Sequence, residues 1–464
     1  MLRGEIDKVR ILSDIGGLSV FQGKTTPPAR LTPTTITETP LPEDKVSAFS
    51  PLAQPLAQPL EVALPAATPA KTYVSAVPTS ISMEVVHSGP ENDNPFMNPV
   101  SACLVGHFDR EIEAHPKAKD ALLKLAPEQQ KQVRDLIGHE SLRDASSPSP
   151  KYTSTKAVEN LVGLLASGRL LAKDSQGSTT LDHLVQLQNE PLDAGFTSKR
   201  GVLFAELTAN LNCAGETHQY THGTCSPTSL EYLHVKKEPS DYARVMVGLL
   251  SEGGEVKFKG GETFERNCTG IKDDSSGRSN IDRVYQSSMM GHACQNRALY
   301  NNYDDSFYSL SHRKFRESGL FNTQSNHLMT QIFGKTTKVM EYDNNPKTFQ
   351  ADVKRALNLD QAVWVSLKWD PNPDARDSNH ALAVEKWENG KVYLRNPHGE
   401  QEDGGTNGPS RSLQGDKGEI VLDQEVFFKH LNSAIRPERP FYHVWANRVR
   451  FFFGGEEGVK KGPN

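Results

Sequence analysis

The alternation of apolar and polar residues is clearest in the last third of the chain. After Asn345 and Pro346, apolar residues recur at intervals of three and four, which predicts an amphipathic helix. Residues 362–369 are mostly apolar, and residues 380–387 show a similar pattern after a polar loop. We therefore expect a helix followed by two strands.

A hairpin is predicted at the end of the second strand. Asn389 and Gly390 form the strongest short hairpin signal, and the returning strand covers residues 391–395. His380 opens the first strand of this hairpin, and Asn396 lies just past the end of the second. We expect these two side chains to lie at the same edge of a sheet.

A helical spacing dominates residues 96–195. Helices are predicted to begin at Pro127, at a cap formed by Ser154 or Thr155, and near Thr180. Two interpretations of this region stay open. It is either a structural subdomain packed on the following unit or a regulatory, pro-like segment.

Both ends of the chain lack such patterns. Residues 1–95 are rich in proline and poor in aromatic residues, and residues 51–60 form the near-repeat PLAQPLAQPL. A segment of this composition cannot bury enough apolar surface to offset its ordering entropy, so we predict a disordered arm. We predict a flexible tail over residues 456–464 and one main domain over residues 196–455.

Cys225 lies where another helix is predicted to begin. Pro227 suits a first helical turn, and Leu230 and Leu233 follow at helical spacing. A thiol at a helix N-terminus faces unpaired backbone N–H groups and the positive end of the dipole, which favours the nucleophilic thiolate. Gln219, six residues earlier, can direct its side-chain amide at an oxygen held near the thiol, as an oxyanion donor does.

The middle of the chain gives weaker signals. A helix is predicted after Pro239 and a strand over residues 254–260, whereas residues 267–333 are expected to be mostly irregular helix and loop. His292 and Cys294 are two residues apart and point in different directions on either a strand or a helix. Cys294 is therefore interpreted as structural.

Charge and cysteine content narrow the function classes. The net charge of −5 gives no basic excess for nucleic acid or an anionic membrane surface. Five scattered cysteines without a C-x-x-C pair argue against a disulfide framework and a thiolate zinc site. No apolar run reaches the roughly 18 residues of a membrane span, and residues 1–7 carry charge where a signal peptide has its apolar core. We expect a cytoplasmic protein, or one exported as an effector without a standard signal peptide.

No cofactor or metal is expected. The acidic loop with Asp370, Asp374 and Asp377 lacks the glycine and terminal glutamate of an EF-hand, so solvated turns are predicted there instead of a calcium site. His222 is expected to be an exposed loop histidine. The tryptophans are expected to lie in the core; they are Trp364, Trp369, Trp387 and Trp445.

Cys225, His380 and Asn396 together form the set that a Cys-His-Asn enzyme requires. A histidine that titrates near neutrality can accept the thiol proton, and an asparagine amide oxygen can hold the other ring nitrogen and fix the tautomer. His380 follows Cys225 by 155 residues (380 − 225), and Asn396 follows His380 by 16 (396 − 380). The order matches the papain pattern, and the span is slightly longer than the roughly 130–150 residues of that pattern.

The motifs around these residues resemble those of the papain-like cysteine peptidases, and are most similar to the calpain-type catalytic core. The resemblance covers roughly residues 200–450. It rests on Gln-x5-Cys at Gln219 and Cys225, on His-Ala at His380, and on the block Asn-Pro-His-Gly-Glu over residues 396–400, which is similar to the calpain block Asn-Pro-Trp-Gly-Glu. The strand and helix that these peptidases place after the asparagine resemble residues 418–422 followed by Glu425, Phe427 and Leu431.

The resemblance implies an α+β fold of the papain-like, two-lobed kind, with a helical lobe that carries Cys225 and an antiparallel β lobe that carries His380 and Asn396. It also implies a cysteine endopeptidase that acts on protein or peptide substrates. Cys225 is then the nucleophile, His380 the base and Asn396 its orienting group. Gln219 and the backbone N–H of Cys225 stabilise the oxyanion.

Three departures from the family pattern are found, and alternatives stay open. The first is that the stretch between Gly260 and Phe333 matches no family pattern. His398 stands where the family has a tryptophan that shields the His–Asn hydrogen bond, and Ser226 stands where an aromatic residue follows the nucleophile. One alternative is another thiol acyl-transfer enzyme, a transglutaminase or glutamine deamidase. The other is a catalytically silent papain-like module used for binding.

Overall fold

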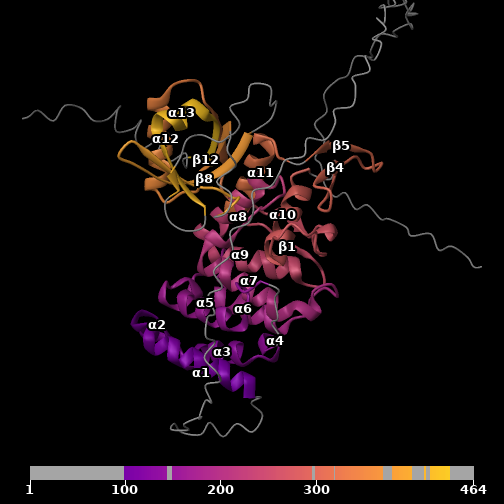
Figure 1. Cartoon of the computed structure of the whole chain (residues 1–464), viewed down its shortest axis with the longest axis vertical. Coiled ribbons are helices and arrows are strands. Elements are labelled where there is room, and N and C mark those ends of the chain that lie inside the picture. Colours follow the sequence, from indigo (N-terminus) through magenta and orange to yellow (C-terminus); the bar gives the residue numbers. More distant parts are fainter. Residues whose placement is uncertain are drawn as a thin grey trace, which may run out of the picture. The chain divides into compact units, whose positions relative to one another are not determined.

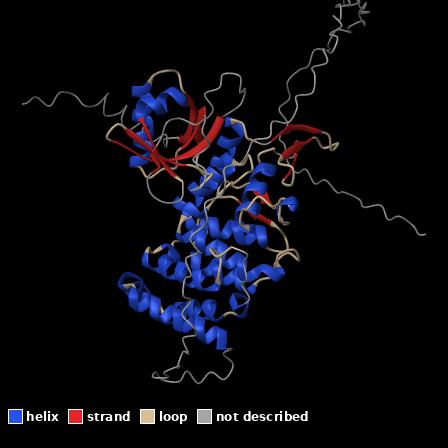
Figure 2. Cartoon of the chain, viewed as in Figure 1, coloured by secondary structure: helices blue, strands red, loops and turns tan. Residues whose placement is uncertain are grey.

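The protein combines a helical region with an antiparallel sheet, which confirms the α+β class (Figures 1 and 2). The computed structural model describes residues 99–143, 149–294, 298–317, 319–368, 379–399, 412–413 and 418–438, all within one unit, Pro90–Asn464. The predicted arm (1–95), the predicted tail (456–464), the acidic loop, Trp369 and Trp445 lie outside these residues.

The first described elements are helices, drawn in indigo and magenta in Figure 1. They are α1 Pro99–Ala114, α2 Pro116–Lys124, α3 Pro127–Gly138, α4 Glu140–Arg143, α5 Ser154–Ala166, α6 Thr180–Asn189 and α7 Arg200–Asn212. The helices predicted at Pro127 and Thr180 are confirmed. The predicted cap of α5 is wrong, because Thr153 accepts the hydrogen bond from Lys156 N at 3.2 Å and so caps the helix one residue earlier than expected.

One hydrophobic core runs from α1 into the second half of the chain. Helix α5 packs against α7, and α6 packs against α9 (Pro239–Leu250). Leu161 of α5 and Phe204 of α7 are both fully buried in this core. The boundary predicted between residues 195 and 196 stays a prediction, but the shared core is what a structural subdomain requires.

The middle of the chain contains long helices separated by very short strands. The helices are α8 Cys225–Lys237, α9, α10 Asn280–His292 and α11 Asn322–Phe333, and the strands are β1 Glu255–Lys257, β2 Thr263–Glu265, β3 Leu299–Asn301, β4 Ser306–Tyr308 and β5 Lys314–Glu317. Strands β1 and β2 form a hairpin, so the strand predicted over residues 254–260 is confirmed in a shorter form. The sheet formed by β3, β4 and β5 corrects the prediction of helix and loop, because strands of three or four residues give almost no alternation to detect.

The last third forms a seven-stranded antiparallel sheet. Its elements are β6 Thr337–Glu341, α12 Pro346–Asn358, β7 Trp364–Lys368, β8 Asn379–Glu388, β9 Lys391–Arg395, β10 Ser412–Leu413, β11 Glu419–Asp423, α13 Gln424–His430 and β12 Leu431–Pro437. The strand order is β10-β11-β9-β8-β7-β12-β6. The predicted hairpin is confirmed: Asn389 and Gly390 have φ values of 51° and 74°, and Glu388 pairs with Lys391 across the turn. Leu431 begins β12 and is not part of the preceding helix, which corrects that prediction.

The sheet is covered on both faces. Ala381 and Ala383 of β8 belong to the same core as α8, whereas Leu382 and Val384 belong to a second core with α12 and α13. This alternation follows from the two-residue period of a strand. Trp364 and Trp387 are buried, as predicted. Because α8 packs against β8, the start of α8 lies near the beginning of β8, where His380 is located.

Candidate active site

Cys225 is the first residue of α8, as the sequence predicts, and it lies against β8. One turn further along the helix, Ser229 Oγ donates to the carbonyl oxygen of Ala381 at 3.0 Å, which fixes the helix to the strand. Cys225 is partly buried and lines a cavity of about 170 Å³. The cavity is also lined by Ser226, Gly319, Leu320, Phe321, Asn322, Trp364, Ser366, Asn379, Ala381 and Asn432.

The environment of the sulfur raises the pKa of the Cys225 thiol above its ordinary value. Burial is the main cause, because it disfavours the charged thiolate, and the carboxylate of Asp305 acts in the same direction. The backbone N–H groups of Ala381, Ser226 and Cys225 itself lower the pKa and only partly compensate. The expectation that the helix N-terminus favours the thiolate is therefore wrong in its net direction, since packing around the sulfur outweighs the amide donors.

His380 and Asn396 meet at the end of the hairpin, as predicted. The Nε2 atom of His380 lies 2.8 Å from Oδ1 of Asn396, and both residues are buried. The backbone N–H of His398 donates to the same Oδ1 at 3.2 Å, and a backbone N–H can only donate, which fixes the orientation of the amide. Because Oδ1 accepts, Nε2 of His380 carries the proton and Nδ1 has the lone pair. The tautomer is that of a base acting through Nδ1.

His398 lies beside this hydrogen bond. Its ring stacks on that of His380, with centroids 4.9 Å apart and planes 18° apart. Its Nδ1 lies 3.2 Å from the carbonyl oxygen of Tyr220, and its Nε2 lies 3.5 Å from Nε2 of Gln219. An imidazole at this position therefore covers His380 and also joins the hairpin to the loop that leads into Cys225.

Gln219 is held firmly in that loop. Its backbone N–H donates to the carbonyl oxygen of Pro397 at 2.9 Å, and its side-chain Nε2 donates to the carbonyl oxygen of His222 at 2.8 Å. Its Oε1 is buried and has no hydrogen-bond partner among the described residues. The second Nε2–H of Gln219 points toward His398, and its role as an oxyanion donor stays a prediction.

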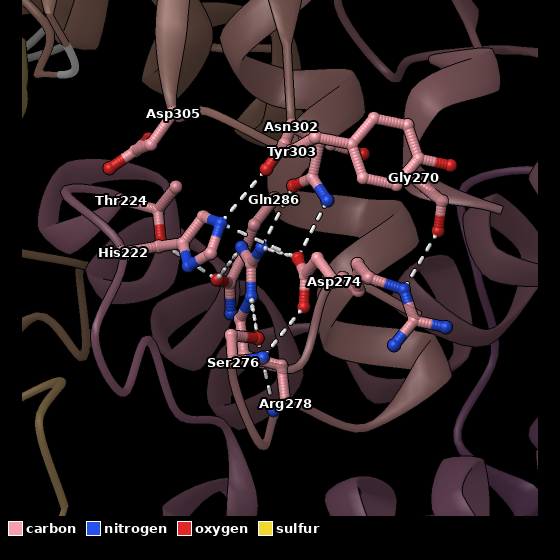
Figure 3. A network of polar contacts seen from close by, with 12 residues as sticks. His222, Thr224, Gly270, Asp274, Ser276, Arg278, Gln286, Asn302, Tyr303 and Asp305 are labelled. Atoms are coloured by element: carbon pink, nitrogen blue, oxygen red, sulfur yellow. Dashed lines mark hydrogen bonds and ion pairs between the residues drawn. The ribbon is translucent and has the colours of Figure 1, made fainter. Parts of the chain in front are cut away.

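A buried polar network holds the last part of this loop, residues 222–224, in place (Figure 3). Nε2 of His222 lies 2.9 Å from the carbonyl oxygen of Asn302 and 3.4 Å from Oδ2 of Asp274. Thr224 donates to Oε1 of Gln286 at 2.9 Å, directly before Cys225. His222 is buried, so its predicted exposure is wrong. A histidine in a loop becomes buried here because distant segments supply its partners.

Arg278 links the members of the network. Its Nη2 donates to Oδ2 of Asp274 at 2.5 Å and to Oδ1 of Asn302 at 2.8 Å, and its Nη1 donates to Gln286 at 3.2 Å. Arg278 and hydrogen bonds from Ser276 hold the pKa of the Asp274 carboxyl below its usual range, against the effect of burial. These residues carried no recognisable motif in the sequence, because each one is meaningful only beside the others.

Buried carboxyl groups lie next to the network. Asn210 donates to Oδ1 of Asp282 at 2.8 Å, and the other Asp282 oxygen accepts from the backbone of His218 at 3.3 Å. Burial raises the pKa of Asp282 to about 7, and it also raises the pKa of Glu206 to about 7. Asp282 and Glu206 are therefore buried carboxyl groups that change protonation near neutral pH.

No protein-family model matches the chain, and a search of curated proteins finds no similar sequence. Among the helices of the described residues, none has the length and apolar character needed to cross a membrane. The functional interpretation therefore rests on the geometry of the residues themselves.

Proposed function

We propose that the chain is a cysteine endopeptidase with a two-lobed, papain-like arrangement, in which Cys225 lies on the helical side and His380 and Asn396 on the sheet side. One observation carries the proposal: the hydrogen bond from His380 Nε2 to Asn396 Oδ1, with the amide oriented by the backbone of His398. This bond leaves the lone pair on Nδ1 of a histidine whose neighbour, Ala381, is in contact with the thiol of Cys225.

The proposed reaction begins with transfer of the thiol proton to Nδ1 of His380. The sulfur of Cys225 attacks a peptide carbonyl carbon, and the resulting oxyanion accepts hydrogen bonds from the backbone N–H of Cys225 and from Gln219. The imidazolium of His380 then gives its proton to the leaving amine as the C–N bond breaks. Water hydrolyses the acyl-enzyme and regenerates the thiol.

The raised pKa of the Cys225 thiol determines at which stage of the proposed reaction its proton passes to His380. A thiol that stays protonated at neutral pH must be deprotonated by His380 as it attacks, so the proposed resting state is a neutral pair rather than an ion pair. We therefore expect the rate of alkylation of Cys225 by iodoacetamide to keep rising with pH toward and beyond the ordinary thiol value of 9.0. A rate that is already constant between weakly acidic and neutral pH would indicate a resting thiolate.

The cavity beside the thiol offers a place for a substrate side chain. Its wall combines apolar groups of Leu320 and Trp364 with the polar groups of Asn379 and Asn432. A volume of about 170 Å³ suits a single side chain next to the bond that is cut. This is the chemistry expected of a protein or peptide substrate bound in an extended form.

A covalent probe tests the proposal directly. The folded chain is treated with a thiol-directed epoxide, and the labelled residue is identified by peptide mass spectrometry in the wild type, in Cys225→Ala and in the matched control Cys294→Ala. We expect the label on Cys225, lost in Cys225→Ala and kept in Cys294→Ala, because Cys294 is buried. Labelling of Cys294 with Cys225 unmodified would refute the assignment.

The alternatives are separated by the products. Incubation with a protein library is expected to produce new N-termini, as peptide-bond hydrolysis requires. Unit-mass shifts without new N-termini would indicate glutamine deamidation, and crosslinked products would indicate transglutamination. A chain that binds a protein partner but neither reacts with the probe nor changes the library would be a silent binding module.

A further inference from the structure

Two histidines and a glutamate from three separate segments converge away from the residues of the proposed reaction. Glu262 lies in the turn between β1 and β2, His292 ends α10, and His327 lies in the middle of α11. Nε2 of His292 is 3.0 Å and Nε2 of His327 is 2.9 Å from the same oxygen, Oε2 of Glu262. No short sequence motif contains them.

The hydrogen-bond chemistry of this group is unusual. A carboxylate oxygen can only accept, so both Nε2 atoms must carry a proton and both point at one oxygen. The two rings are nearly parallel, with centroids 6.0 Å apart and planes 19° apart. Two imidazole nitrogens and a carboxylate oxygen that converge on one place are a donor set for a transition metal.

We propose that Glu262, His292 and His327 bind a divalent transition metal ion of the zinc class. Two imidazole nitrogens and one carboxylate oxygen match the ligands that Zn²⁺, Co²⁺ and Ni²⁺ take, whereas Ca²⁺ and Mg²⁺ require oxygen ligands. The three ligand atoms lie within 4.8 Å of one another. On binding, each neutral imidazole moves its proton from Nε2 to Nδ1 and offers the Nε2 lone pair, so the proton count does not change.

The backbone around the group is already fixed for such a site. Gln331, one turn after His327 on α11, accepts from Gly260 N through its backbone oxygen at 2.8 Å and from Glu262 N through Oε1 at 3.3 Å. The hairpin turn is thus tied to the helix that carries His327. Preorganised ligands reduce the entropy lost on metal binding, which favours affinity.

Two aromatic rings and a cavity border the group formed by Glu262, His292 and His327. The rings of Phe258 and Phe264 lie edge-on against His292, each with a centroid distance of 5.5 Å. Glu262 and His292 also line a cavity of about 810 Å³, together with Cys268 and Tyr300. Three protein ligands with a fourth position open to a cavity give a metal that can still take up water or a small anion.

The metal would tie together segments that meet the wall of the Cys225 cavity. Helix α11 carries His327, and its first residue, Asn322, lines that cavity, while Ser325 Oγ lies 2.7 Å from Ser226 Oγ. Loss of the ion is therefore expected to loosen this wall. Binding itself does not depend on the proposed peptidase activity and is measured without it.

The test uses the full chain after treatment with a chelator. Zn²⁺ is titrated by calorimetry and Co²⁺ by its visible absorption, with Ca²⁺ as the comparison ion. We expect one Zn²⁺ per chain, a Co²⁺ spectrum with nitrogen and oxygen ligands, and no comparable binding of Ca²⁺. A wild-type chain with a native circular dichroism spectrum that binds no Zn²⁺ stoichiometrically would overturn the proposal.

Three variants keep the test independent of folding defects. His292→Ala and His327→Ala are expected to abolish the stoichiometric site, and Glu262→Gln to weaken it by about tenfold or more. Glu262 is exposed in a turn, so its substitution is expected to leave the melting temperature of the metal-free chain unchanged. The matched control is His115→Ala, which removes a surface histidine that pairs with one glutamate on α1. Equal Zn²⁺ affinity in Glu262→Gln, His292→Ala and His115→Ala would refute the site.

Discussion

Two pairs of stacked histidines lie in different parts of this molecule, and they differ in the acceptor that their ring nitrogens meet. In the hairpin pair, His380 and His398, the rings are 4.9 Å apart and His380 meets the uncharged amide oxygen of Asn396. In the α10–α11 pair, His292 and His327, the rings are 6.0 Å apart and both meet a carboxylate oxygen.

The difference shows how the acceptor decides what a histidine can do. An amide oxygen fixes which ring nitrogen carries the proton but adds no charge, so the ring can still gain and lose a proton near neutral pH. A carboxylate adds a negative charge, which favours a cation at the same place, either an imidazolium or a metal ion. The hairpin pair is therefore suited to proton transfer and the α10–α11 pair to cation binding.

The largest expected effect comes from removing the proposed base. His380→Ala should reduce turnover of a peptide substrate by a factor of about 10²–10⁴, because the thiol then has no positioned group to take its proton. Asn396→Ala should reduce turnover less, since Asn396 orients the base without carrying the proton. Both are measured as kcat/KM with the melting temperature as the control for folding. Equal losses in two variants of native stability would show that Asn396 has a further role.

The difference between the two histidine pairs can be removed by giving His380 a carboxylate acceptor as well. Asn396→Asp places a carboxylate against His380, which raises the pKa of this ring because the negative charge stabilises the imidazolium. A protonated base cannot accept the thiol proton, so the acid limb of the pH–rate profile should shift upward by about one unit or more. Asn396→Gln keeps an uncharged amide and serves as the control. An unshifted acid limb in Asn396→Asp would contradict the role given to the uncharged acceptor.

The buried carboxyl groups of Glu206 and Asp282 test the difference between a charged and an uncharged group through the free energy of unfolding. Glu206 and Asp282 have pKa values of about 7 in the folded chain, well above their ordinary values of 4.5 and 3.8. The folded state therefore holds these protons more tightly than the unfolded state does. The stabilisation is complete below about pH 4 and is lost as the pH rises through 7, by about 3 kcal/mol for Glu206 and about 4 kcal/mol for Asp282.

Urea unfolding measures this loss. Between pH 5 and pH 8 the free energy of unfolding should fall in the wild type and change less in Asp282→Asn and Glu206→Gln, which cannot ionise. Asp120→Asn, at an exposed position on α2, should follow the wild type. Wild-type and variant curves with the same pH dependence would place the titration elsewhere.

The smallest expected effect concerns the ring that covers His380. His398→Trp keeps an aromatic face over His380 but loses the contacts to Tyr220 and Gln219, so turnover should fall only a few-fold. His398→Ala loses both and should fall by about tenfold. The measurement is kcat/KM on the same peptide substrate. Equal activity in the two variants would mean that stacking contributes nothing measurable.

The elements that the sequence predicts well are those with a local cause. The Asn389-Gly390 turn and the proline-led start of α8 are encoded by neighbouring residues, so the hairpin with His380 and Asn396 and the helix that begins at Cys225 are both confirmed. Strands β7, β8, β9 and β11 lie where the apolar runs and the turn predict strands, whereas the sequence analysis does not predict β6, β10 or β12.

The features that the sequence does not predict depend on contacts between distant segments. His222 is buried because Asn302 and Asp274 reach it from the region between α9 and α11, and the Glu262 cluster forms from three segments. The direction of the pKa shift at Cys225 likewise depends on how tightly the sulfur is packed, which no local pattern records. The residues of such sites are not separated by any regular spacing from which a sequence analysis could predict them.

The position of β12 in the sheet has a consequence for synthesis. Strand β12, Leu431–Pro437, lies between β7 and β6 and pairs with both, although it is the last described strand of the chain. During translation, the end of β6 leaves the ribosome 90 residues before its partner strand begins to emerge (431 − 341 = 90), and β6 stays without this partner during that interval. A partly made chain therefore exposes an open strand edge and lacks a finished sheet beneath His380. We expect nascent chains to recruit chaperones during this interval, and the proposed activity to appear only after β12 has been made and has paired with β6.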